Sequence, residues 1–165
     1  MSRYAVYGLA DAASRDDASP VFNVGDKFYD AANDRVIQYV LFDNGAGNVA
    51  AVAGNLAYWL TRNATTYTVT MDVSDSDRNL VCGVFLNVIT DGQYGFIQIA
   101  GRYATVKTNA DDDITKGDAV IASAAGDGTA DSTAQDTAPI CRVVGWALAD
   151  DVNAADTVDT LIVLD

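Results

Sequence analysis

The fold class is decided by a short stretch with a strict two-residue period, residues 67–73, which read YTVTMDV. Tyr, Val, Met and Val occupy every second position, and two threonines and an aspartate lie between them. Successive side chains of a β-strand point to opposite faces, so the apolar side chains would share one face and the polar ones the other. The stretch therefore predicts a strand that is buried on one side.

Runs of similar residues lie on both sides of this stretch. Residues 35–42 (RVIQYVLF) are rich in β-branched and aromatic side chains and end at an Asp-Asn-Gly sequence, which is a strong hairpin signal. Residues 80–90 are nearly continuous in apolar side chains, which suits a strand buried on both faces. Residues 94–106 predict one long or bulged strand that glycines interrupt. Residues 123–137 predict a loop. Further strands are expected near residues 21–24, 27–30, 114–122, 140–148 and 157–164 and in the second half of 48–59, a segment whose alanine content would also allow a short helix.

The composition also favours strands. All 23 acidic residues are aspartate, and the 165-residue chain contains no glutamate. Aspartate favours turns and caps, whereas glutamate is a good helix former, so helices are disfavoured. No crossover helices are indicated, which argues against a parallel sheet. We therefore predict an all-β fold, a small β-barrel or β-sandwich domain with an extended N-terminal docking segment.

One turn sequence recurs along the chain. Residues 23–29, 52–58 and 115–121 each place Gly-Asp or Gly-Asn before an apolar alternation. Two explanations stay open, because all-β proteins reuse the same turn and because a duplicated unit would leave the same trace.

Several classes of function are disfavoured by what the chain lacks. Without histidine, Ser-His-Asp and Cys-His catalysis and the usual zinc sites are excluded. A net charge of −13 argues against binding nucleic acid through its phosphates. No apolar run approaches the roughly 20 residues that cross a bilayer, and the first eight residues do not read as a signal peptide. We expect a protein that is not an enzyme, needs no cofactor, and binds neither nucleic acid nor membrane.

The aspartate clusters are weak candidates for chemistry. Residues 111–113 and the alternating acids of 72–77 could hold a cation, but solvated turns explain both better, and we expect no metal site. The Asp-Thr-Gly motif of aspartic proteases is absent. Cys82 and Cys141 lie among apolar residues and are expected to be buried free thiols, although a disulfide is an alternative.

Aromatic side chains crowd the first sixty residues. Core packing would explain some of them, and an arm that docks on a partner would explain the rest. We predict that residues 1–45 form an N-terminal docking segment with a β-hairpin and that residues 46–165 form a β-barrel-like domain. The candidate interface residues are Tyr4, Tyr7, Phe22, Phe28 and Tyr29.

A series of motifs runs in order through the last two thirds of the chain. They are residues 72–76 (DVSDS), 82–84 (CGV), 92–101 (GQYGFIQIAG), 116–123 (KGDAVIAS), 143–149 (VVGWALA) and 160–164 (TLIVL). In this order, they make the chain from residue 67 onward resemble the head decoration and cement proteins of tailed bacteriophages.

The resemblance implies a structural virion protein. Such a protein is made in the host cytoplasm and sits on the outer capsid surface as a homotrimer or another small symmetric oligomer. Its partners would be the major capsid protein and other copies of itself, and it would cement neighbouring capsid subunits. The main alternative is a head fibre or receptor-binding module that recognises host surface glycans through exposed aromatic side chains. An aspartate-based hydrolase acting on polysaccharide is a more distant alternative.

Overall fold

The computed structural model describes residues 5–6, 14–63, 65–109, 114–123, 126–132, 142–151 and 156–164. Strands dominate these residues, and the helical element η2 (Arg78–Leu80) has only three residues. The prediction of an all-β fold is therefore confirmed. Within the described ranges, no helix is long and apolar enough to cross a bilayer.

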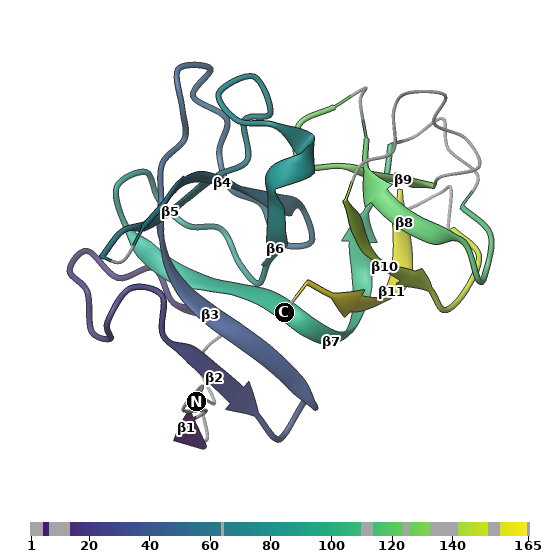
Figure 1. Ribbon diagram of the computed structural model, residues 1–165, viewed down its shortest axis with the longest axis horizontal. Coiled ribbons are helices and arrows are strands. Elements are labelled where there is room, and N and C mark those ends of the chain that lie inside the picture. The colour runs from purple at the N-terminus through teal and green to yellow at the C-terminus, as the bar shows by residue number, and fades with distance from the viewer. Residues whose placement is uncertain are drawn as a thin grey trace.

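Among the described residues, eleven strands form one continuous hydrogen-bonded sheet (Figure 1). Its order is β1-β2-β3-β5-β4-β6-β7-β11-β10-β8-β9, with a further pairing between β3 and β7. The strands are β1 (Ala5–Val6), β2 (Lys27–Asp30), β3 (Arg35–Phe42), β4 (Leu56–Arg62), β5 (Tyr67–Thr70), β6 (Val81–Phe85), β7 (Tyr94–Lys107), β8 (Ala119–Ala122), β9 (Ala130–Ser132), β10 (Val143–Ala147) and β11 (Thr157–Val163).

Most of the predicted strands are present, but several other expectations are wrong. β5 is not buried on one side alone, because Thr68 and Thr70 are buried as well as Val69. The long strand over 94–106 is β7, and the ambiguous segment 48–59 ends in β4 without a helix. Residues 21–24 form no strand, and β9 lies inside the segment predicted as a loop. The Asn-Gly sequence after β3 forms no hairpin, because β3 pairs with β5 in parallel and with β7 in antiparallel orientation.

The pairing of β3 on both sides closes a barrel. β3, β5, β4, β6 and β7 follow one another in the sheet, and β7 returns to β3 over seven residue pairs. Closure of this kind removes the exposed strand edges that would invite aggregation. Because β3 is a barrel strand, the end of the predicted N-terminal segment shares a sheet with the strands beyond residue 46.

β7 belongs to two structures at once. Its first half, residues 94–101, pairs with β3, whereas residues 100–107 pair with β11. β10, β8 and β9 continue from β11, and a bridge between Thr108 and Ala130 brings β9 back beside the end of β7. Figure 1 shows β7 crossing from the barrel to this second sheet, which consists of β8–β11 and the second half of β7.

In the described part of the chain, three clusters of buried side chains form the core. One, which includes Phe42, Trp59 and Ile97, has members from all five barrel strands and fills the barrel. A second cluster includes Leu56 and Val144 and lies between the barrel wall and the second sheet. The third surrounds Tyr39 and packs the N-terminal segment against β3 and β7. The barrel wall therefore buries apolar side chains on both of its faces, which explains the continuous apolar run of β6.

The recurring turn of the sequence is one hydrogen-bonded structure, which occurs four times within the described ranges. Each copy has a glycine with positive φ two residues before a strand, and the residue after the glycine donates back to the carbonyl three residues earlier. The glycine N–H donates to a carbonyl on a neighbouring strand, and the N–H of that same neighbour donates to the residue after the glycine. Two residues thus face one, as in a glycine β-bulge. The glycine and neighbour pairs are Gly25 with Tyr39, Gly54 with Phe85, Gly92 with Phe42, and Gly117 with Ala147.

Two of these glycines differ in the space around them. Gly54 and Gly117 have nearly the same φ, +90° and +96°, but a Cβ on Gly54 would lie 2.4 Å from the carbonyl oxygen of Thr105, whereas one on Gly117 would meet nothing within 4 Å. Gly117→Ala should therefore lower the free energy of unfolding by roughly 1 kcal/mol, the penalty of a left-handed backbone. Gly54→Ala should lower it by roughly 3 kcal/mol, because the backbone of β7 must also move. Urea denaturation measures both, and equal losses would contradict the packing argument.

Candidate functional site

The outer face of β10 and β11 is apolar and exposed. Trp146 on β10 is directly opposite Leu161 on β11 in the antiparallel ladder. Their exposed fractions are 48% and 40%, and Val163 and Leu148 on the same two chain segments are 49% and 36% exposed. We call these four residues the apolar face.

The strand period places these side chains outward. In β11, Val158, Thr160 and Ile162 are buried, and Asp159, Leu161 and Val163 alternate with them. A sheet with one solvated face normally carries polar side chains at the outward positions. Here two of the three outward positions of β11 are apolar, and a tryptophan stands beside them. Contiguous exposed apolar groups of this kind mark interaction surfaces.

An ion pair borders the apolar face. Arg102 on β7 holds Asp159 with two nitrogens, at 2.9 Å from Nε to Oδ1 and 2.7 Å from Nη2 to Oδ2. The hydrogen bond to Asp159, together with its negative charge, raises the pKa of Arg102. The fork geometry fixes both side chains in one plane. The rim of the apolar face is therefore ordered and carries no net charge at this point.

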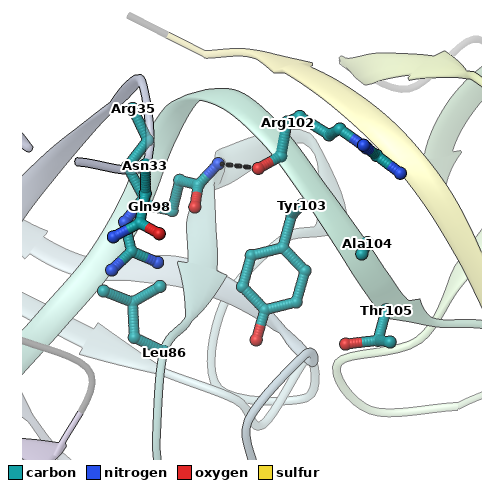
Figure 2. A pocket seen from close by; sticks show the side chains of 8 residues that line it. All are labelled: Asn33, Arg35, Leu86, Gln98, Arg102, Tyr103, Ala104 and Thr105. Carbon is teal, nitrogen blue, oxygen red and sulfur yellow. Dashed lines mark hydrogen bonds between the residues drawn. The ribbon is translucent and has the colours of Figure 1, made fainter. Parts of the chain in front are cut away.

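A hollow of about 430 Å³ lies on the other side of Arg102. Figure 2 shows the guanidinium of Arg102 directed away from the hollow toward β11, while the ring of Tyr103 lies at its centre. Tyr103 donates to the carbonyl of Phe85 at 3.2 Å, and Gln98 Nε2 donates to the carbonyls of Gly101 and Arg102. The lining residues are Asn33, Arg35, Leu86, Gln98, Arg102, Tyr103, Ala104 and Thr105.

The charged groups beside the hollow are already paired. Arg35 Nε donates to Asp30 Oδ2 at 2.8 Å, and Asn33 donates to the same oxygen. Burial alone would raise the pKa of Asp30, but the hydrogen bonds from Asn33 and Arg35 and the charge of Arg35 hold it below its usual value. These contacts fix the wall of the hollow, and they offer a ligand mixed polar and aromatic surface.

The aspartates of residues 72–77 hold the backbone. Asp72 is buried and accepts from the backbone and hydroxyl of Ser74 through Oδ1 and from the Gly47 N–H through Oδ2. Asp75 accepts from the Ala46 N–H, and Asp77 caps η2 by accepting from the Asn79 N–H. Among the described residues, no group of three or more Cys or Asp side chains could hold a metal ion. The cluster at 111–113 lies outside the described residues.

Asp72 makes the structure sensitive to acid. The Ser74 hydroxyl and the surrounding backbone N–H groups lower its pKa below the ordinary value of 3.8, although burial opposes them. A carboxyl with a lowered pKa stabilises the fold above the pKa of the unfolded chain, and this stabilisation is lost as the pH falls through the folded-state value.

Removing the Ser74 hydroxyl should therefore move the titration of Asp72. In Ser74→Ala, the pKa of Asp72 should rise toward 3.8, because its strongest hydrogen bond is gone. Carboxyl-carbon NMR titration measures the change. Ser76→Ala is the matched control, because the Ser76 hydroxyl donates instead to the carbonyl of Trp59 at 2.7 Å. An unchanged Asp72 titration in Ser74→Ala would contradict this account.

The residues of the predicted N-terminal interface are separate from the apolar face, and the described ones are less exposed. Phe28 is 4% exposed, and Phe22 packs on it with ring centroids 5.0 Å apart, so both rings serve the core of the chain itself. Tyr29 is partly exposed and donates to Asp34 Oδ1 at 2.6 Å. Tyr4 and Tyr7 lie outside the described residues. The burial of Phe28 corrects the expectation that its ring is presented to a partner.

The comparisons with known proteins supply no further constraint. No protein-family model matches the chain, and no curated protein matches it.

Of the two cysteines, Cys82 is a buried free thiol that contacts the carbonyl of Ala57, and Cys141 lies outside the described residues.

Proposed function

We propose that this chain is a structural virion protein that binds the outer surface of a bacteriophage capsid and cements neighbouring subunits. The ordered motifs between residues 72 and 164 support this role through their resemblance to decoration and cement proteins. The apolar face is the single structural observation that carries the proposal, because it gives such a protein a surface for attachment.

The face has the features of a binding site for protein. Tryptophan is enriched among the few residues that dominate binding energy, and Trp146 lies opposite Leu161 at the middle of the exposed set. β10 and β11 are held in antiparallel ladders with each other and with β8 and β7, so little ordering is needed upon binding. A modest contact of this kind becomes stabilising for a shell when it is repeated many times, since a ligand that binds only the assembled state shifts its stability.

The hollow beside Arg102 supports one alternative. Its aromatic ring and its fixed polar groups resemble the mixed lining that binding sites for small polar ligands use. This observation favours a head fibre or receptor-binding module that recognises host glycans. A glycan-binding screen of the purified protein, with Tyr103→Ala as the negative control, separates this alternative from the capsid role.

Substitutions on the apolar face should weaken capsid binding. Trp146→Ser combined with Leu161→Ser should weaken binding to capsids that lack the protein by roughly 30-fold or more, since a central tryptophan contributes about 2 kcal/mol or more. Co-sedimentation measures binding, and heat resistance of the capsids measures cementing.

Leu80→Ser is the matched control, because Leu80 is similarly exposed, at 46%, but lies in η2, outside the β10–β11 ladder that carries the apolar face. It should bind capsids as the wild type does. Failure of the wild-type protein to bind any capsid of its own phage would refute the proposed function. Binding by the double variant at wild-type strength would refute the role of the apolar face.

A further inference from the structure

A second, smaller cavity gathers positive charge in this acidic chain. Its volume is about 100 Å³, and Lys27 of β2, Arg62 of β4 and Arg142 beside β10 contribute to its wall. These are three of the ten lysines and arginines in a chain of net charge −13, and no aspartate of the described residues lines the cavity. We propose that this cavity binds a single oxyanion, a carboxylate or a phosphate group. The inference does not rest on the capsid role.

Both arginines contact neutral groups. Arg142 donates to the carbonyls of Val81 at 3.2 Å and Leu164 at 3.0 Å, and the guanidinium of Arg62 lies 5.3 Å from the centre of the Trp59 ring. Within the described part of the chain, neither arginine forms a salt bridge. Carbonyl groups and an aromatic ring orient a guanidinium but do not neutralise its charge. Among the described residues, the guanidinium groups of Arg62 and Arg142 are therefore held by neutral partners and keep their charge for an anion.

The two positive charges act at the same place. Cys82 lines the cavity, and burial raises the pKa of its thiol well above the usual value. The charges of Arg142 and Arg62 both lower this pKa, and both arginines line the same cavity as Cys82. They converge although Arg62 ends β4 and Arg142 precedes β10, so the fold and not the sequence spacing brings them together.

The size of the cavity selects the ligand. A volume of about 100 Å³ corresponds to roughly three water molecules at about 30 Å³ each, which is well below the 300–1,000 Å³ of drug-sized sites. A carboxylate or a phosphate group fits this space, and its two or three oxygens match the several donors of two guanidinium groups. The anion could be free in solution or could be an acidic side chain that a partner protein presents.

The stacking of Arg62 on Trp59 provides a direct signal. The chain has two tryptophans, so Trp146→Phe leaves Trp59 as the only one. An anion that draws Arg62 away from the ring should change the emission of Trp59. Inorganic phosphate and sodium acetate are titrated separately at constant ionic strength. Saturation by phosphate alone identifies a phosphate site, and saturation by acetate identifies a site for carboxylate side chains.

Variants of the two arginines decide whether the response comes from this cavity. In the Trp146→Phe background, Arg142→Gln should weaken anion binding about tenfold while leaving the Arg62–Trp59 contact in place. Arg62→Gln should also weaken anion binding about tenfold. This variant is measured by the rise in melting temperature with added anion, which does not depend on the emission of Trp59. Arg102→Gln is the matched control, because Arg102 pairs with Asp159 outside the cavity, and it should respond as its parent does. No saturable response to either anion, or equal responses in Arg142→Gln and Arg102→Gln, would overturn the proposal.

Discussion

The structure depends on the hydrogen bonding of β7, one uninterrupted strand of 14 residues. Its first half closes the barrel against β3, and its second half is the first strand of the second sheet. Gly101, with φ +97°, lies where these two pairings overlap, and a Cβ there would come within 2.5 Å of the carbonyl oxygen of Asp34. A side chain at this position would push β7 away from the turn before β3, so the glycine allows one strand to serve both structures.

The second consequence of this arrangement is a barrel wall with two apolar faces. In β4, Ala57 and Trp59 point into the barrel, while Leu56 and Tyr58 face the second sheet. Every residue of β6 is buried for the same reason. The wall therefore stabilises both cores at once, whereas β10 and β11 are covered on their inner side alone. Their outer side is not covered by another described element, and the apolar face lies on this side.

The local features of this fold could be predicted from the sequence, and the long-range ones could not. The apolar run of β6 predicts burial on both faces, and every residue of β6 is buried. The alternation of residues 67–73 predicts burial on one side only, but Thr68, Thr70 and Asp72 on its polar face are buried as well. Barrel closure leaves no such trace. The Asn-Gly after β3 predicts a hairpin by local rules. Asp72 and Asp75 instead accept hydrogen bonds from the N–H groups of Gly47 and Ala46, 25 and 29 residues away, and hold this segment in a different conformation. For the site, the excess of aromatic residues predicts an interface that includes Phe28. Composition cannot distinguish a buried ring from an exposed one, and Phe28 belongs to the core.

The cavity of the two arginines meets the apolar face at the ends of β10 and β11, because Arg142 directly precedes β10 and Leu164 directly follows β11. Arg142 lies four residues before Trp146, and Leu164, whose carbonyl binds Arg142, directly follows Val163. A partner that packs along β10 and β11 therefore approaches the strand ends that form the cavity wall. In the proposed capsid role, an acidic side chain on that partner would find positive charge there, while the remaining acidic surface would repel surfaces of the same sign. Charge would then fix the orientation of the contact, and the apolar side chains would supply most of its binding free energy.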